Sequence, residues 1–472
     1  MRLLYVFLLI SCSLSVSADT SKYTWLNIFV TDKGKDRVTA IPIDSVSDMR
    51  FIRHNEMSDF YDSISIVLKN EQKCILSMND VSEYSLGSNV PTLYITTNPV
   101  VSEISSKSEY LSAKFSMNCY GNYEDLDNVS VNIRGRGNST WGYAKKPYRL
   151  KFEKKVSLCG LKKAKSYVLI ANYIDNTLMK NAIAFKIGEL LNMPYTNHSI
   201  PVNVVLNGKF KGAYMLSEKI GINSGSVDID EEEGIIWEMD SYFDEEYKFK
   251  SQIYNLPVMV KDPDLIEIVN PKDGQTAEVA VDELLKKWQA DFEQMEASVK
   301  TGNPENFIDI EQAVNYLLVN LVALNWELNW PKSVYLFKEN AESLYKMGPL
   351  WDYDCAFNFQ NSFDRKLFLS GDIFVGAKFY LDLIKSEVFK SAFEQKWILF
   401  KTELFPQVLE YMDEYAGIVK VSALQNGECW PGTGPDGNGR SSEDFSAALS
   451  ELKDWLIKRV EFIDEAPYYG FF

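Results

Sequence analysis

Two aspartates in the segment WDYD (351–354) form the most chemically suggestive pair in this 472-residue sequence. Asp352 and Asp354 are two positions apart, so on a strand their side chains would point to the same side. Paired carboxylates on one face suit a hard divalent cation such as Mg²⁺. A turn in which each aspartate makes local hydrogen bonds is the alternative. The aromatic surroundings favour the metal site, because uncompensated charges there would be costly.

The segment RGRGNSTW (134–141) is a polar, glycine-bearing loop between two predicted strands. Glycines let backbone N–H groups approach an anion, and polar side chains add further donors. We therefore interpret the loop as a candidate cover for phosphate groups; a tight hairpin with solvated arginines is the alternative. The donor side chains belong to Arg134, Arg136, Asn138, Ser139 and Thr140.

Lys151 lies on the predicted strand that follows this loop, on the same face as Arg149. A lysine that projects from a strand beneath a phosphate-covering loop could neutralise phosphates. An ordinary surface lysine fits the same pattern.

A third polar segment, NWELNWPKS (325–333), follows a long apolar helical pattern. Glu327 could accept a hydroxyl proton, and Asn329 could hold a metal ion or a phosphate. A polar helix C-terminus is the alternative. The hairpin expected between this segment and the two aspartates favours the functional interpretation.

The elements that must position these residues predict an α+β protein. Short alternating runs indicate a small β module over 20–88 and a strand-rich half over 90–240. An Asn207-Gly208 turn predicts a hairpin, and Asp175 or Thr177 could cap a helix over 177–191. Amphipathic helices and one inserted, aspartate-bearing hairpin dominate 241–472. This order suggests a two-lobed body with a cleft between the lobes.

The N-terminus reads as an export signal. Residues 1–18 combine Arg2, an apolar run and small residues before Asp19, and they are too short for a membrane span. The residues around Cys12 also resemble a lipoprotein box. We expect an exported protein that is periplasmic, secreted or lipid-anchored at the cell surface, with membrane contact only through a lipid on Cys12.

Composition excludes several classes of function. The formal net charge of −17 makes a nucleic-acid-coating role improbable. With two histidines, the chain has no multi-His zinc site and offers little support for a Ser-His-Asp triad. The scattered cysteines indicate neither a zinc site nor a dense disulfide framework.

Taken together, these segments resemble the CotH kinase family, named for spore coat protein H. The similarity rests on ordered blocks over about 90–470, and the N-terminal β module is not part of it. The blocks are IRGRGNSTW, KKPYRLKF, ANYIDNTLMKNAIAF, VNVVLNGKFKGAYMLSEKI, NWELNWPKS and GPLWDYDCAF.

The resemblance implies an atypical protein-kinase-like fold that transfers phosphate from ATP to Ser or Thr of an exported protein, with Mg²⁺ or Mn²⁺. It implies that the RGRGNST loop and Lys151 bind the nucleotide phosphates, and that Glu218 lies in a hinge beside adenine. The helix after Asp175 would be the regulatory helix of the small lobe. The implied catalytic residues are Glu327, Asn329 and Asp352, and the implied metal ligands are Asp352 and Asp354.

Two other classes of function stay open. Glu327 stands where many family members carry Asp, so a kinase-like surface binding protein with weak or absent catalysis is the main alternative. The aromatic content and the export signal would also fit a glycan-handling protein.

Overall fold

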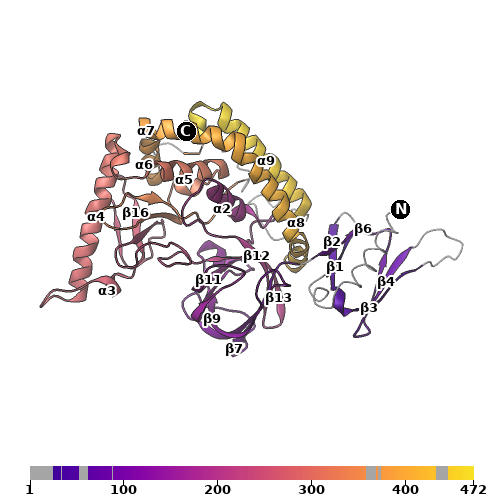
Figure 1. Ribbon diagram of the computed structural model, residues 1–472. Coiled ribbons are helices and arrows are strands. Elements are labelled where there is room, and N and C mark those ends of the chain that lie inside the picture. The colour runs from indigo at the N-terminus through magenta and orange to yellow at the C-terminus, as the bar shows by residue number, and fades with distance from the viewer. Residues whose placement is uncertain are drawn as a thin grey trace.

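The computed structural model describes residues 25–32, 35–52, 62–87, 89–357, 368–369, 374–431 and 445–471. The predicted α+β class is confirmed, since strands dominate the first half of the chain and helices most of the second (Figure 1). The predicted signal (1–18) and Cys12 lie outside the described residues.

The strands of the described residues are β1 (Trp25–Asp32), β2 (Lys35–Pro42), β3 (Val46–Ile52), β4 (Ser63–Leu68), β5 (Lys73–Ser77), β6 (Val81–Gly87), β7 (Thr92–Asn98), β8 (Leu111–Asn118), β9 (Leu126–Gly135), β10 (Tyr148–Val156), β11 (Ala164–Ile170), β12 (Ile200–Leu206), β13 (Lys209–Glu218), β14 (Ile235–Met239), β15 (Lys248–Lys250), β16 (Pro257–Asp262), β17 (Val334–Lys338) and β18 (Lys346–Met347). The helices are α2 (Lys180–Leu190), α3 (Leu265–Ile268), α4 (Ala277–Thr301), α5 (Ile310–Ala323), α6 (Val375–Ile384), α7 (Glu387–Leu399), α8 (Phe405–Cys429) and α9 (Phe445–Glu465).

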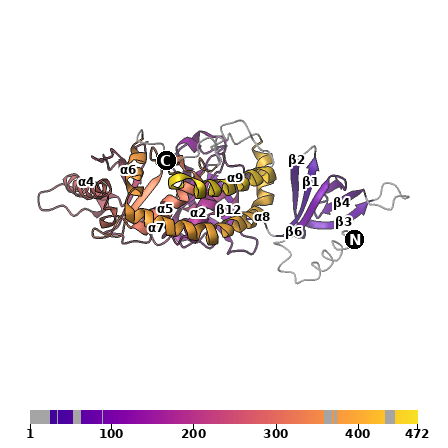
Figure 2. The ribbon, with the colours of Figure 1, turned by 90° about the horizontal axis from the view of Figure 1, so that it is seen from above.

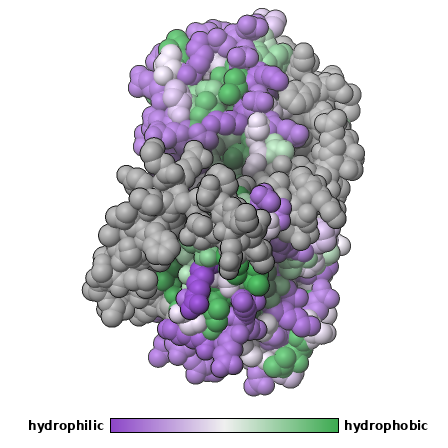
Figure 3. Space-filling view, turned by 90° about the vertical axis from the view of Figure 1, so that its right-hand side faces the viewer, coloured by the Kyte–Doolittle hydropathy of each residue, from purple (hydrophilic) through white to green (hydrophobic). Residues whose placement is uncertain are grey.

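The first six strands form a separate small module. They build two three-stranded sheets, β2-β1-β6 and β3-β4-β5, around a core of their own. The module lies beside α8, where the Lys420 ammonium sits 4.3 Å from the centroid of the Phe29 ring (Figure 1). Figure 3 views the molecule from this side, where hydrophilic residues cover much of the coloured surface.

Strands β7 to β13 close into a barrel in the order β10-β11-β13-β12-β7-β8-β9. The pairs are antiparallel, except that β7 and β12 are parallel. Alternation along each strand sends one set of side chains inward, as with the buried Leu150 and Phe152 of β10. The predicted turn connects β12 to β13, with φ of 51° at Asn207 and 75° at Gly208. This barrel is the rigid frame for the glycine-bearing loop.

A second sheet, which the sequence analysis did not predict, has the antiparallel order β15-β16-β14-β17-β18. Its central strand β14 falls within 90–240 by number, but it pairs with β16 and β17 rather than with the barrel. The expected hairpin, β17 and β18, is the edge of this sheet. All five residues of β14 are buried, which explains their uninterrupted apolar character apart from Glu238.

The helices pack around α5, whose residues from Ala313 to Ala323 are all buried. Helices α2, α7 and α9 lie against it (Figure 2). Helix α8 contacts the barrel at β13 (Figure 1). Helix α2 begins at Lys180 rather than at 177, and its N-cap residue is Met179 instead of Asp175 or Thr177. Asp175 still satisfies the first N–H group of the helix, because its Oδ2 accepts from Lys180 N at 2.9 Å. The buried face of α2 belongs to the large helical core and not to the barrel interior. None of the helices in the described part of the chain has the length and apolarity that crossing a bilayer requires.

Candidate active site

One cavity of about 740 Å³ is lined by residues of the barrel and of the five-stranded sheet with its flanking turns. The barrel contributes the glycine-bearing loop and the ends of β9, β10 and β11. The other half contributes β14, the turn after α5 and the segment after β18. Cationic and acidic side chains from distant parts of the sequence therefore face the same space.

The glycine-bearing loop closes one side of this cavity, and its backbone is held on both flanks. Gly135 N donates to Ser106 O at 2.8 Å, and the Lys107 ammonium donates to Gly137 O at 2.9 Å. A Cβ on Gly135 would lie 2.1 Å from the ring of Trp141, so the loop requires glycine there. The five donor residues predicted from this segment, Arg134, Arg136, Asn138, Ser139 and Thr140, all line the cavity.

Arginines create the positive side of the cavity. Among the described residues, the Nε atoms of Arg134 and Arg149 are buried and have no hydrogen-bond partner. A buried guanidinium nitrogen without an acceptor is costly, and an anionic ligand would supply the acceptor. Burial, together with nearby Arg149 and Lys261, lowers the pKa of Lys219 to about 8. The two buried Nε atoms without an acceptor and the mutual repulsion of these cations favour a polyanion in the cavity.

Arg136 connects the positive side to the acidic side. Its guanidinium lies 5.4 Å from the centroid of the Trp351 ring. Burial lowers the pKa of Arg136, and the negative charges of Asp352 and Asp354 act in the opposite direction. The loop arginine therefore faces the carboxylates that the sequence analysis assigned to a metal.

Three carboxylates form the acidic side: Glu327, Asp352 and Asp354 all line the cavity. Glu327 lies on a short 3-10 turn (Trp326–Leu328), where Asn325 Oδ1 accepts from its backbone N–H at 3.3 Å. Burial and the charges of Asp352 and Asp354 raise the pKa of Glu327 well above its usual value. Burial and the neighbouring Asp352 likewise raise the pKa of Asp354.

The two aspartates are brought together differently from the prediction. Residues 351–354 are not a strand, so strand alternation is not what aligns Asp352 with Asp354. Instead Asp352 adopts φ of +63°, a left-handed conformation that turns the chain between the two carboxyl groups. Such a conformation in a non-glycine residue costs on the order of 1–3 kcal/mol and is concentrated at functional sites.

A divalent cation fits this set of donors. The carboxyl groups of Asp352 and Asp354 contact each other through a hydrogen bond, which requires that one of them carries a proton. In the part of the chain that the structure describes, no three His, Cys, Asp or Glu side chains form a metal-holding group. A cation would thus take these two carboxylates and complete its shell with water and phosphate oxygens, as Mg²⁺ usually does.

Three predicted site residues do not line the cavity: Lys151, Glu218 and Asn329. Lys151 is exposed, with its ammonium 5.9 Å from the ring centroid of Tyr110, while Arg149 reaches the cavity. The two are about 6–7 Å apart along β10, and the cavity lies at the Arg149 end.

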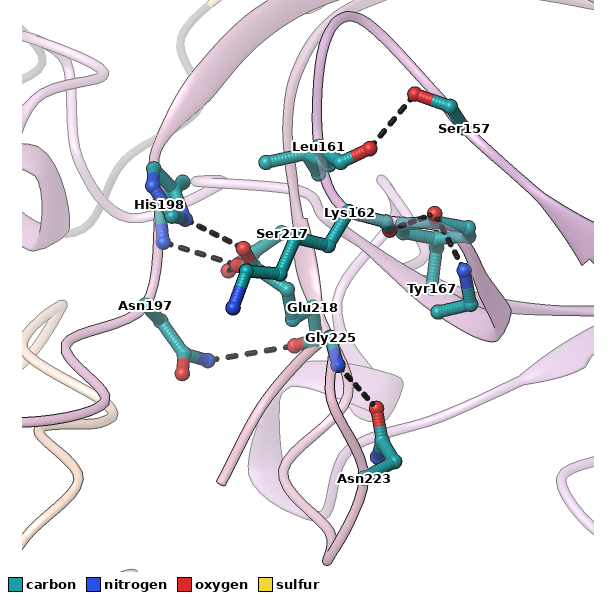
Figure 4. Close-up of polar contacts among 11 residues, drawn as sticks. Ser157, Leu161, Lys162, Tyr167, Asn197, His198, Ser217, Glu218, Asn223 and Gly225 are labelled. Carbon is teal, nitrogen blue, oxygen red and sulfur yellow. Dashed lines mark hydrogen bonds and ion pairs between the residues drawn. The ribbon is translucent and has the colours of Figure 1, made fainter. Parts of the chain in front are cut away.

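Glu218 points away from the cavity because neighbouring residues of a strand face opposite sides. Its carboxylate accepts from His198 N at 2.9 Å and contacts His198 Nδ1 at 2.5 Å (Figure 4). The hydrogen bond from Glu218 raises the pKa of His198. The next residue, Lys219, lines the cavity instead.

Asn329 is fully buried and holds the turn that carries Glu327. Its Nδ2 donates to Trp326 O and to Phe368 O, each at 3.0 Å. Its carbonyl accepts from Gly376 N at 3.0 Å, at the start of α6. In this structure Asn329 therefore positions the Glu327 turn rather than facing a ligand.

The sequence analysis missed several charged residues of the cavity wall. Asp240 follows β14, accepts from Tyr242 N and Ser333 N at 2.8 and 3.0 Å, and has a pKa raised to about 6 by burial. Lys261 contacts Glu238 at 2.6 Å. The sequence did contain a signal, since Glu238 and Asp240 interrupt an otherwise apolar strand sequence. Burying a charged side chain costs free energy, so two acidic residues in such a strand indicate a functional role.

A comparison with known protein families shows to which family the chain belongs. No curated protein matches the chain. The family model described as CotH kinase protein matches residues 133–463, which is more than half of the chain and includes the glycine-bearing loop, Glu327, Asp352 and Asp354. The chain belongs to the CotH kinase family.

Proposed function

We propose that the chain is an exported, metal-dependent phosphotransferase that moves the γ-phosphate of ATP to a Ser or Thr hydroxyl of an exported protein. One observation carries the proposal: the cationic, glycine-bearing loop and the three carboxylates line the same cavity. Family membership supports a kinase-like function. In this proposal the barrel and the helix-rich half act as the two lobes of an atypical kinase.

The positive side of the cavity would hold the triphosphate. Arg134 and Arg149 have buried guanidinium nitrogens that need acceptors, and phosphate oxygens are strong acceptors in a matching geometry. Ser139 and Thr140 add hydroxyl donors on the same loop. The apolar side chains of Val168, Ile170 and Ile220, which also line the cavity, would contact the purine.

The acidic side would hold the metal and accept the proton. Asp352 and Asp354 would bind Mg²⁺ or Mn²⁺, which when bound neutralises charge on the phosphates. Glu327 would accept the hydroxyl proton as the acceptor oxygen forms a new bond to the γ-phosphorus. The bond from that phosphorus to the bridging oxygen breaks, and ADP leaves with the electron pair. A carboxyl group whose pKa is raised is a stronger base once it is ionised.

The experiment is transfer of labelled γ-phosphate from ATP to protein in the presence of Mg²⁺ or Mn²⁺. We expect transfer by the wild-type chain and loss of at least about 100-fold in Asp352→Asn, because the cation loses a ligand. The control is Lys151→Ala, which changes an exposed cation outside the cavity. Absence of any ATP- and metal-dependent thermal shift in the wild-type chain would contradict the proposal.

Binding without catalysis is the second candidate function, and Glu327 favours it. Burial and the neighbouring carboxylates raise its pKa, which favours the protonated side chain when no cation is nearby, and a protonated carboxyl cannot act as a base. A nucleotide-dependent thermal shift without phosphate transfer to any tested acceptor or to the chain itself would select this function.

Export rests on residues 1–18 alone. We propose cleavage either before Asp19 or at Cys12, with a lipid on Cys12 in the second case. The mass of the N-terminal peptide of the mature protein decides between them. An intact Met1 in cells that export other proteins normally would contradict both.

A further inference from the structure

Two cysteine side chains meet at the end of the barrel that lies away from the cavity. Cys119 directly follows β8, and Cys159 lies in the connection from β10 to β11. The cavity lies at the opposite end, where Gly135 pairs with Tyr148. Both cysteines are buried, with 0% and 3% of their surface exposed.

The two thiols contact each other directly. A hydrogen bond joins the side chains of Cys119 and Cys159. Cys159 Sγ also lies 3.5 Å from Met117 Sδ, on the same face of β8 as Cys119. The Cys119 thiol donates to Glu124 O at 3.6 Å. The sulfur atoms are thus close neighbours within one buried cluster.

The backbone around both cysteines is fixed by hydrogen bonds. Cys119 N donates to Asp125 Oδ1 at 2.8 Å. Around Cys159, Ser157 Oγ donates to Leu161 O at 2.6 Å, and the Tyr167 hydroxyl contacts Lys162 O at 2.9 Å (Figure 4). A pair of thiols held in contact by ordered segments needs little rearrangement to form a bond.

We propose that Cys119 and Cys159 form an intrachain disulfide when the chain folds in an oxidising compartment. The inference rests on the export part of the proposed function, because such compartments lie outside the cytoplasm. It does not rest on phosphate transfer. The other described cysteines lie elsewhere: Cys74 in the N-terminal module, Cys355 beside the cavity carboxylates and Cys429 at the end of α8.

The reaction is thiol–disulfide exchange with a disulfide-bearing oxidant such as oxidised glutathione or an oxidised thiol oxidoreductase. The thiolate of one cysteine attacks an oxidant sulfur, and the other oxidant sulfur leaves as a thiolate. The second cysteine then attacks the mixed disulfide, forms the Cys119–Cys159 bond and releases the remaining oxidant thiolate. The pair loses two electrons and two protons, and the oxidant gains both. The hydrogen bond from Cys159 lowers the pKa of Cys119, which favours Cys119 as the attacking thiolate.

The bond would close a ring that contains β9 and β10, at the end of the barrel away from the cavity. Cross-linking residues this far apart restricts the unfolded chain more than the folded one. We therefore expect the oxidised barrel to unfold at a higher temperature, with the cavity at the other end unchanged.

The experiment compares the full chain exported with its own signal and the same chain made in a reducing cytosol. Each is denatured in iodoacetamide without reductant, digested and analysed by mass spectrometry. We expect one cross-linked peptide pair containing Cys119 and Cys159 in the exported chain, with Cys74, Cys355 and Cys429 alkylated. The cytosolic chain should have all five thiols alkylated, and should gain the cross-link when refolded from denaturant with oxidised glutathione.

Two matched variants test whether the cross-link and its effect on melting temperature belong to Cys119 and Cys159 or to another cysteine. Cys159→Ser should leave Cys119 open to alkylation and should remove the drop in melting temperature that reductant causes in the wild-type chain. Cys74→Ser should keep both the cross-link and that drop. Alkylation of both Cys119 and Cys159 when the exported chain is denatured in iodoacetamide would overturn the proposal.

Refolding with oxidised glutathione tests the disulfide separately from export and from phosphate transfer. If the chain is not exported, failure to cross-link on refolding still overturns the disulfide. If the cross-link forms but no phosphate is transferred, only the proposed phosphotransfer fails.

Discussion

Arg149 and Lys151 occupy alternate positions on one face of β10, yet only Arg149 reaches the cavity. The sequence analysis chose Lys151 and only placed Arg149 on the same face, because residue type and strand period do not show where the strand meets the cavity. That boundary lies where β9 ends, because its last residue, Gly135, pairs with Tyr148 beside Arg149. A sequence pattern therefore predicts the face of a strand more reliably than the position of a ligand along it.

Substitution of these two cations provides a direct test. We expect Arg149→Met to weaken ATP binding about 10- to 100-fold, because a buried guanidinium–phosphate contact is lost. Lys151→Met removes a cation from the same face of the same strand and should change the dissociation constant less than about twofold. Calorimetry or a thermal-shift titration with ATP and Mg²⁺ measures both. Equal losses in the two variants would contradict the assigned roles.

Glu327 predicts a pH dependence of the reaction. Because its pKa is raised well above the usual value, the base is protonated at low pH, and the rate should rise with pH until Glu327 ionises. A higher metal concentration should move this rise to lower pH, since a nearby cation favours the carboxylate. The pH profile of kcat/KM at two Mg²⁺ concentrations checks this. The variant Glu327→Gln should have no measurable transfer rate. If its pH profile of kcat/KM matched that of the wild-type chain, Glu327 would be excluded as the base.

Asp354 predicts an effect on stability. Its folded-state pKa is raised above 3.8, so at intermediate pH the folded chain keeps a proton that the unfolded chain releases. Stability therefore falls as pH rises from 3.8 through the folded pKa. We expect Asp354→Asn, which cannot ionise, to melt at a higher temperature than the wild-type chain at neutral pH without metal. Adding Mg²⁺ should raise the melting temperature of the wild type more than that of the variant.

At the scale of elements, local sequence patterns predicted a helix after Asp175, a helix-rich second half, the hairpin at Asn207 and the strand class of the barrel segments. They did not predict the barrel itself, because closure depends on pairs distant in sequence, such as β7 with β12. They also missed the second sheet, whose central strand β14 pairs with β17 across the intervening helices α3 to α5. Long-range pairing, set by packing rather than by local preference, accounts for both omissions.

The start of α6 supports the turn that carries Glu327. A Cβ on Gly376 would lie 2.0 Å from Leu328 O and 2.9 Å from Asn329 O, so the helix can approach the turn only through glycine. We expect Gly376→Ala to destabilise the fold by about 1–3 kcal/mol, as overpacking usually does. It should also lower the phosphotransfer rate by displacing Glu327. Thermal unfolding and the rate assay measure the two effects.

Gly417 in α8 provides the matched control. Nothing lies within 4 Å of a Cβ at this position, and alanine is the better helix former. Gly417→Ala should therefore raise stability by about 0.5–1 kcal/mol and leave the rate unchanged. If both glycine variants behaved alike, the close approach at Gly376 would not be what positions the turn.

For the molecule as a whole, Lys145 provides one of the polar links between the barrel and α8. Its ammonium is buried, contacts Ala213 O and donates to Asn426 Oδ1 at 2.8 Å. Trp430 Nε1 reinforces the link by donating to Lys211 O at 2.9 Å. A single residue next to the glycine-bearing loop thus connects that loop's base to the helix-rich half.

Burial lowers the pKa of Lys145 from 10.5 to about 7, and this predicts how the link responds to pH. Between these two values the unfolded chain binds a proton that the folded chain lacks, so this contribution to stability rises with pH. Compared with Lys145→Met, the wild-type chain should gain stability as pH rises from about 7 toward 10.5. Denaturant unfolding of both chains across that range measures the difference, and a constant difference would show that the ammonium does not titrate in this window.

The closed barrel has a practical consequence for dividing this protein into fragments. The stretch recognisable as CotH begins at residue 133, inside β9, and ends at residue 463. A piece cut there would lose β7, β8 and most of β9, and would leave the rest of β9 and all of β12 with unpaired edges that promote aggregation. It would also lose Gly470 and Phe471, whose carbonyls accept from Phe368 N and Leu369 N. The segment that the family model matches is therefore shorter than the folded unit. Truncated chains should begin before Thr92 and keep the residues up to Phe471.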